Sequence, residues 1–311
     1  MYAVILALLP AWIVSIIFFG WPALLVTLTS IVACLVIEWF VNRYMLGNKS
    51  LTITDGSAIL TGLLLAMNLP STLPLWIVVI GAIVAIGIGK MSFGGLGNNI
   101  FNPAIVGRVM LLISFPQQMT SYPPTRFAHL AVDAVTAPTP LGIAKGIIHG
   151  TGSMADLPSI WDAFLGQVGG SFGEVSALAL LIGFIYLLIR KVVTWHIPVA
   201  IFATAFVFGG IMHLVNPELY IHPLYHLLAG GMMLGGLYMA TDYVTSPMSN
   251  SGMLLYGALI GLITILIRLF GAYPEGISFA ILFMNGIVPL INRYMRPKVF
   301  GDKAPHKPKV A

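Results

Sequence analysis

The chain has 311 residues, of which 58% are hydrophobic and only 8% are charged, and its mean hydropathy is +0.96. Because soluble globular domains carry about 25% charged residues, this composition excludes a soluble enzyme and indicates an integral membrane protein. The formal net charge of +5 does not indicate a nucleic-acid partner. The basic residues are scattered or gathered near the C-terminal end, where they are better read as markers of membrane topology.

Ten apolar segments are candidates for membrane-spanning helices, each of which needs about 20 residues to cross the hydrocarbon core. The third and the eighth end in NLPSTLP and ATDYVTSP, as broken helices do. The first has no basic leader and no small-residue cleavage site, so we do not expect a cleaved signal peptide. The predicted spans are 3–19, 22–41, 56–69, 75–89, 99–115, 174–189, 196–215, 224–240, 253–270 and 276–291.

The distribution of lysine and arginine predicts the orientation of these spans. With the N-terminus in the cytoplasm, the outward connections contain only Arg126, Lys145 and Arg268. The positive-inside rule therefore places both termini in the cytoplasm and the long connection 116–173 outside. The basic residues predicted to lie inside are Arg43, Lys49, Lys90, Arg190, Lys191, Arg293, Arg296, Lys298, Lys303, Lys307 and Lys309.

Three consecutive spans are similar to three later ones, in the same order. Partner spans lie five helices apart, and because five is odd the two halves must be inverted. Inverted repeats with paired broken helices are typical of transporters; chance similarity between glycine-rich helices is the alternative. The similar stretches are AILTGLLLAMNLPST and MMLGGLYMATDYVTS, GAIVAIGIGK and GALIGLITILIR, and NIFNPAIV and ILFMNGIV.

We therefore predict an all-α integral membrane protein of about ten transmembrane helices, arranged as two inverted five-helix repeats with broken helices. Residues 1–115 form the first repeat and residues 174–293 the second. The connection 116–173 forms an extracytoplasmic loop between them, and residues 294–311 form a basic cytoplasmic tail. The pair Ser171 and Glu174 has the spacing of a capping box, which predicts that this loop is fixed at the start of the sixth span.

Ionisable residues inside spans are costly and often functional. Arg108 either extends toward the outer surface or faces an anion in a pocket on the loop side. Asp242 either caps the next turn or contacts an ion or a cofactor. Glu38 lies near the inner side close to Arg43, so we predict an interfacial ion pair between them.

Other polar and reactive residues give weaker signals. Gly95 belongs to the tract KMSFGGLGNNIFNPA, whose glycines let the backbone approach a ligand closely, although the tract lacks the ending of a P-loop. His213, His222 and His226 could hold a metal, but their setting favours an interfacial role. Cys34 is the only cysteine and lies in an apolar stretch, so we read it as a packing residue.

Four stretches together resemble a known family. GGLGNNIFNPAIVGR, DAVTAPTPL, MATDYVTSP and YGALIGLITILIRLFGAYPEGISFAILFMN are similar to the signatures of the D subunit of the bacterial Rnf complex and of its paralogue, the B subunit of the sodium-pumping NADH:quinone oxidoreductase. The resemblance covers nearly the whole chain. The quinone-reductase paralogue carries a longer polar N-terminal region than this chain, which favours the Rnf member.

The resemblance implies that FMN is attached covalently, through its phosphate, to a threonine. The family motif has an acid, then Ser or Thr, two small residues and the acceptor Thr; Asp133, Thr136 and Thr139 occupy these positions, so Thr139 is the implied acceptor. This chain reads TAPT where the family more often reads SGAT. A modifying enzyme must reach the hydroxyl, so we expect an exposed, extended loop in which Pro138 and Pro140 keep Thr139 out of a regular helix.

The resemblance also suggests further ligands and residues. A noncovalent riboflavin is implied, and Arg108, Arg126 or Lys145 could balance the charge of the FMN phosphate. We place Asn102, Gly95 and Asp242 among the candidate cofactor-binding residues. A site for the transported ion is predicted at Asn68, Asp242 and Thr245 near the paired broken helices.

The function implied is that of a membrane component of an ion-translocating oxidoreductase, which relays electrons through FMN and couples them to Na⁺ or H⁺ movement. The implied partners are the A and E subunits of the Rnf complex in the membrane, its flavin-carrying G subunit, its iron–sulfur B and C subunits, membrane lipid, and a flavin transferase during maturation. The implied location is the bacterial inner membrane. Two alternatives stay open: the B subunit of the quinone reductase, and a channel or transporter of similar architecture without redox chemistry.

Overall fold

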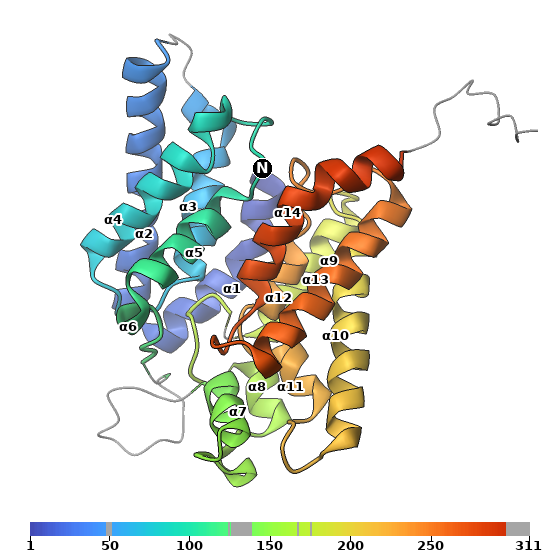
Figure 1. Cartoon of the computed structure of the whole chain (residues 1–311). Helices are drawn as coiled ribbons and strands as arrows, with labels where there is room; N and C mark the ends of the chain where they lie inside the picture. The colour runs from blue at the N-terminus through green and yellow to red at the C-terminus, as the bar shows by residue number, and fades with distance from the viewer. Residues whose placement is uncertain (48–51, 124, 126–138, 167, 175, 297–311) are drawn as a thin grey trace, which may run out of the picture.

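The computed structural model describes residues 1–47, 52–123, 125, 139–166, 168–174 and 176–296, and every regular element in these ranges is a helix (Figure 1). This confirms the all-α prediction. Length and hydropathy alone identify six membrane-spanning candidates within these ranges, and shorter apolar helices accompany them. The six are Tyr2–Phe19, Trp21–Met45, Leu75–Phe93, His196–Val215, Asn250–Phe270 and Ile277–Tyr294.

The first half follows the predicted spans closely. The helix α5 begins at Pro103, because the side chain of Asn102 caps it and a proline at the first position loses no hydrogen bond. Two spans finish as π-helices. The elements are α1 (Tyr2–Phe19), α2 (Trp21–Phe40) with η1 (Val41–Met45), η2 (Thr52–Asp55), α3 (Ser57–Met67), α4 (Leu75–Ala82) with η3 (Ile83–Ile88), η4 (Met91–Phe93) and α5 (Pro103–Ser114).

The second half contains the helices predicted as the sixth to tenth spans, three of which are long and apolar enough to cross a membrane. The eighth span is interrupted at residues 229–231, which the sequence pattern did not predict, and it also ends in a π-helix, η6. The predicted bounds of the seventh span coincide with those of α10. The elements are α9 (Ala177–Ile189), α10 (His196–Val215), α11 (Pro223–Leu228), α12 (Met232–Leu234), η6 (Gly235–Met239), α13 (Asn250–Phe270) and α14 (Ile277–Tyr294).

The helices that are paired by the sequence repeat pack against corresponding neighbours in the two halves. In the first half α2 packs on α3 and α4, and in the second half α10 packs on α11 and α13, while α1 packs on α9 between the halves. Figure 1 shows that α2 ends at the top of the view and α10 at the bottom, so these two helices, which precede the similar stretches of the two halves, run in opposite directions. These opposite directions are what the predicted inverted repeat requires.

The connection between the halves is more structured than a plain loop. It contains α6 (Pro116–Met119), α7 (Pro140–Ile148), η5 (Met154–Asp156) and α8 (Ile160–Leu165). The predicted capping box is wrong, because α9 begins at Ala177 and its cap is Ser176, whose side chain accepts a hydrogen bond from the backbone N–H of Ala179 at 3.3 Å. Glu174 instead forms an ion pair with Arg108.

Small residues allow the central helices to approach closely. At Gly183 in α9, an added Cβ would lie 1.8 Å from the carbonyl oxygen of Ala7 in α1. Glycine at helix crossings is common in membranes, where close backbone contact replaces the hydrophobic driving force. The contact between α1 and α9 therefore depends on the absence of a side chain at this position.

We expect Gly183→Ala to destabilise the protein by about 1–3 kcal/mol or more, because the methyl group must push α1 and α9 apart. The matched control is Gly87→Ala, since an added Cβ at Gly87 has nothing within 4 Å. Thermal unfolding in detergent measures both variants. Equal melting temperatures for the two variants would contradict this account of the crossing.

Candidate functional site

Thr139 lies at the entrance of the helix α7. Its backbone is extended, with φ −74° and ψ 153°, and its Oγ1 accepts a hydrogen bond from the N–H of Gly142 at 3.0 Å. Thr139 is outside the helix, as expected, but the prediction of an exposed, extended loop is wrong on the C-terminal side. Pro140 takes the first helical position, where its fixed φ suits the helix, and the Thr139 side chain is half-buried.

The Thr139 side chain borders two adjoining hollows, which we call the threonine pocket. Both hollows are also lined by Tyr122, Pro274 and Glu275. Glu174 and Ser171 line one hollow, and Arg108 lines the other. The structure therefore brings Thr139 and Arg108, two of the predicted site residues, to one place.

Arg108 is the centre of a buried charge cluster, which we define as Arg108, Asn68, Glu174 and Glu275. Its NH1 donates to Asn68 Oδ1 at 2.5 Å and to Glu174 Oε1 at 2.8 Å, and its NH2 donates to Glu275 Oε2. Arg108 is 4% exposed, which excludes extension to the surface. The guanidinium of Arg108 thus donates its hydrogen bonds to two carboxylates and an amide oxygen.

The two carboxylates of this cluster were not predicted. Glu174 looked like a local cap, and Glu275 gave no signal beyond its position at the end of the ninth connection. Glu275 also accepts from the backbone N–H of Gly231 at the interruption of the eighth span. Burial, and next the negative charge of Glu275, raise the pKa of the neighbouring Tyr122 phenol, so the phenol stays protonated.

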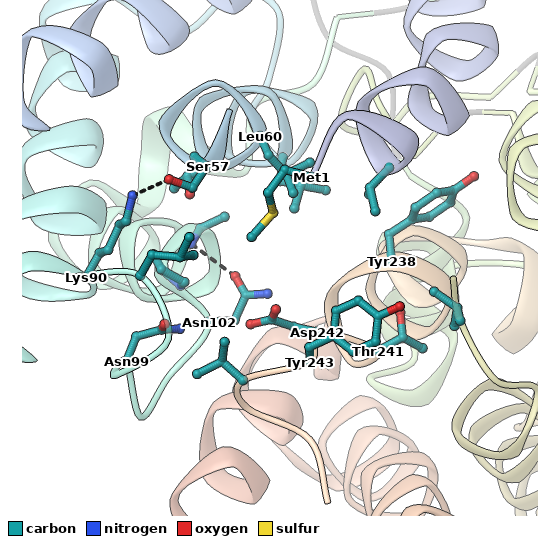
Figure 2. Close-up of a pocket in the computed structure, with 18 of the residues that line it drawn as sticks. Met1, Ser57, Leu60, Lys90, Asn99, Asn102, Tyr238, Thr241, Asp242 and Tyr243 are labelled. Carbon is teal, nitrogen blue, oxygen red and sulfur yellow. Dashed lines mark hydrogen bonds between the residues drawn. The ribbon is translucent and has the colours of Figure 1, made fainter. Parts of the chain in front are cut away.

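A second cavity lies between the two halves, near the other end of α5 (Figure 2). We call it the Lys90 cavity. Its wall combines apolar side chains with Tyr238 and Tyr243. The polar residues of the wall are Ser57, Thr61, Lys90, Asn99, Asn102, Thr241 and Asp242.

The Lys90 cavity contains two further predicted site residues. Asn102 Nδ2 donates to the carbonyl oxygen of Met239 at 3.2 Å, and Asp242 Oδ2 accepts from Thr245 Oγ1 at 3.2 Å. Figure 2 shows both side chains extending toward the same central space. Gly95 has a φ of +92° in the adjacent tract, a conformation that favours glycine, and the neighbouring Leu96 lines the cavity.

Lys90 and Glu38 form a buried ion pair with Nζ 2.7 Å from Oε2. Their side chains are 3% and 1% exposed. The prediction that Glu38 pairs with Arg43 is therefore wrong. An acid inside the bilayer is stabilised most by a cation buried with it, and Lys90 supplies that charge from the end of the fourth span.

The remaining predicted site residues do not come together in one place. Asp133 and Thr136 lie outside the described residues. Asn68 belongs to the charge cluster, whereas Asp242 and Thr245 bond to each other beside the Lys90 cavity. His213 bonds to the carbonyl oxygen of Tyr220 at 2.7 Å, and no cluster of His, Cys, Asp or Glu suited to a metal occurs in the ranges the structure describes.

Residues 1–301 match the model of the NQR2, RnfD, RnfE family. The chain belongs to this family. It is 43% identical to the D subunit of the proton-translocating ferredoxin:NAD(+) oxidoreductase complex of Clostridium ljungdahlii, with 97% of this chain and 91% of that protein covered. It is 42% identical to the D subunit of the Na(+)-translocating complex of Acetobacterium woodii, with 97% and 90% covered. It is 40% identical to the D subunit of the ion-translocating oxidoreductase complex of Stutzerimonas stutzeri, with 100% and 94% covered.

This family assignment confirms the resemblance to the D subunit of the Rnf complex that the sequence motifs indicated. It also agrees with the fold, since a family of membrane-complex subunits requires the multi-pass helical structure seen here. The match extends across both halves and the connection between them, so the threonine pocket and the Lys90 cavity both fall within the matched residues.

We expect Arg108→Met to destabilise the protein by about 3–5 kcal/mol, because it removes the ion-pair partner of Glu174 and Glu275. The triple variant Arg108→Met, Glu174→Gln, Glu275→Gln removes all three charges together, and we expect it to recover much of that loss. Folded yield and melting temperature in detergent measure the difference. If the triple variant is no more stable than Arg108→Met, the carboxylates do not depend on Arg108.

Proposed function

We propose that this chain is the D subunit of an Rnf-type complex, a membrane component of an ion-translocating ferredoxin:NAD⁺ oxidoreductase. It relays electrons through bound flavin and couples their flow to the movement of Na⁺ or H⁺. Family membership over nearly the whole chain supports this function, together with a threonine hydroxyl at the mouth of a pocket inside a membrane bundle.

Thr139 carries FMN in this proposal, joined by a phosphoester to its Oγ. The FMN supplies the one-electron chemistry that protein side chains lack. Thr139 begins α7, and helix N-termini stabilise a phosphate charge. Because the Arg108 guanidinium already holds two carboxylates, we assign the balance of that charge to the start of α7 rather than to Arg108. Leu112, Met119 and Tyr273 give the pocket a partly apolar wall suited to a flavin ring.

The Lys90 cavity is the proposed place of the noncovalent riboflavin. A flavin ring needs an apolar slot with a few polar groups at its edges, as ligand cavities generally have. Asn99, Asn102 and Asp242 supply amide and carboxylate groups, and Leu60, Leu64 and Val193 supply apolar surface. The two proposed flavin sites then lie toward opposite ends of α5, which begins beside the cavity and leads to α6 and the connection containing Thr139.

We further propose that the Lys90 end of the bundle and both termini face the cytoplasm, and that Thr139 lies outside the inner membrane. The basic residues near the Lys90 end support this orientation. The proposed partners are the A and E subunits in the membrane, the flavin-carrying G subunit, and the iron–sulfur B and C subunits. The sites for ferredoxin and NAD⁺ must lie on these partners. A flavin transferase must reach Thr139 during maturation, and lipid surrounds the apolar outer faces.

We expect Thr139→Ala to lose covalent flavin, because alanine offers no hydroxyl for the phosphoester. Thr151→Ala is the matched control, since Thr151 is exposed in the same connection and bonds only locally to the carbonyl oxygen of Gly146. In-gel flavin fluorescence and mass spectrometry of the Thr139 peptide measure the result. An unmodified Thr139 in wild-type protein matured with the transferase would favour a channel or transporter without redox chemistry.

We expect Asn99→Leu to lower the amount of flavin that acid releases from the purified complex, because Asn99 contributes a polar group to the cavity wall. Asn98→Leu serves as the control, since Asn98 is exposed next to it and does not line the cavity. Chromatography of the acid extract measures the released flavin. Equal release from both variants would place the noncovalent flavin elsewhere.

A further inference from the structure

A chain of short hydrogen bonds leads from the Lys90 cavity to the surface at the same end of the bundle. Lys90 Nζ donates to Ser57 Oγ at 2.6 Å, and Ser57 Oγ donates to Asp55 Oδ1 at 2.5 Å. Lys90 and Ser57 both line the cavity, and Figure 2 shows the bond between them. Asp55 is half-exposed at the end of η2 and does not line the cavity.

The direction of these bonds follows from the groups themselves. A lysine ammonium has only donors, and an ionised aspartate has only acceptors. Ser57 has one hydroxyl proton, so when it accepts from Lys90 it must give that proton to Asp55. The three groups are therefore aligned to pass a proton from the cavity side to the surface side.

The groups around Lys90 show that its hydrogen bond to Ser57 is more than part of an ion pair. Glu38 on α2 already neutralises Lys90, with its carboxylate oxygen 2.7 Å from Nζ. The other titratable groups nearby are Cys34 on the same helix and Asp242 on the cavity wall. The bond to Ser57 is thus additional to the bond that balances the charge. The backbone N–H of Ser57 also donates to Asp55 Oδ1, at 2.7 Å, and so fixes the carboxylate beside the hydroxyl.

We propose that Asp55, Ser57 and Lys90 form a proton path between this surface and the group held in the Lys90 cavity. In the outward step an N–H bond of Lys90 breaks and its proton joins Ser57 Oγ, while the hydroxyl proton of Ser57 passes to Asp55. With a flavin in the cavity, the neutral amine of Lys90 would accept the proton that the reduced ring loses when an electron carrier of a partner subunit takes its electrons. Asp55 gives its proton to water, and the reverse sequence delivers a proton on reduction.

This inference rests on the proposed function for the identity of the cavity group, a flavin whose protonation changes with its electrons. The residues have separate roles: Lys90 lines the cavity, whereas Ser57 and Asp55 act through Lys90 and position its proton. Neither Ser57 nor Asp55 is needed to balance the buried charge of Lys90, because Glu38 does so.

The experiment uses the purified complex containing this chain as wild type, Ser57→Ala, Ser57→Thr, Asp55→Asn and the control Ser92→Ala. Ser92 is exposed at the same end and bonds to the carbonyl oxygen of Ile88. Acid-released flavin is quantified first. The rate at which that flavin is reduced and reoxidised is then followed by absorbance, in H₂O and D₂O, as the pH is raised through neutrality.

We expect Ser57→Ala and Asp55→Asn to slow the proton-linked phase by about 10²-fold, the lower end of the range for positioned proton transfer, and to change its solvent isotope effect and pH profile. Ser57→Thr keeps the hydroxyl and should restore the rate, and Ser92→Ala should match the wild type. Should Ser57→Ala fail to fold, Asp55→Asn still decides, because its amide oxygen preserves the bonds from Ser57.

Two negative outcomes are distinguishable. If wild-type complex releases no flavin in acid, the cavity occupant in the proposed function is wrong, and this path has no substrate. If flavin is released in normal amounts but both variants keep wild-type rates and isotope effects, the proton path alone is overturned.

Discussion

The structure depends on hydrogen-bond acceptors for three cations that are buried in the membrane bundle. Lys90, Arg108 and Arg268 are 2%, 4% and 3% exposed. An unpaired charge in such a setting is strongly destabilising, so each cation must find acceptors within the fold. Arg108 takes them from the end of α3 and from the segments that precede α9 and α14, which makes it a direct link between the two halves. Arg268 takes backbone carbonyl oxygens at His226 and Ala229.

These bonds also explain where the chain departs from regular helix. The eighth span is interrupted at residues 229–231, and an interruption inside hydrocarbon leaves backbone groups that need partners. Arg268 bonds to two of the freed carbonyl groups, and Glu275 accepts from the N–H of Gly231. A broken helix is therefore stable here because charged side chains from the ninth span and the following connection replace the missing helical bonds.

Hydropathy and caps predicted most of the helices, because both are properties of neighbouring residues. The predicted seventh span has the same bounds as α10, and Pro103 after Asn102 marks the start of α5. Partners of charged residues are a tertiary property and could not be predicted in this way. Arg43 lies five residues from Glu38 in the sequence, but Lys90, 52 residues away, is the partner. Thr139 was predicted as a site only through a family motif, and of the three cations offered as partners for its phosphate the structure places Arg108 in the same pocket.

The fourth and ninth spans, which the sequence repeat pairs, each have a buried cation near the end, and the two cations differ in kind although they do not align residue by residue. GAIVAIGIGK ends in Lys90, and the similar GALIGLITILIR ends in Arg268. Arg268 donates to backbone carbonyl groups, which neither titrate nor relay protons, and a guanidinium keeps its proton in proteins. Lys90 instead donates to a carboxylate and to a hydroxyl, and a hydroxyl can both accept and donate a proton. An inverted repeat with identical ends would offer no preferred side for proton exchange. In the proposed proton path, exchange takes place at the Lys90 end, whereas Arg268 at the opposite end donates only to backbone carbonyl groups.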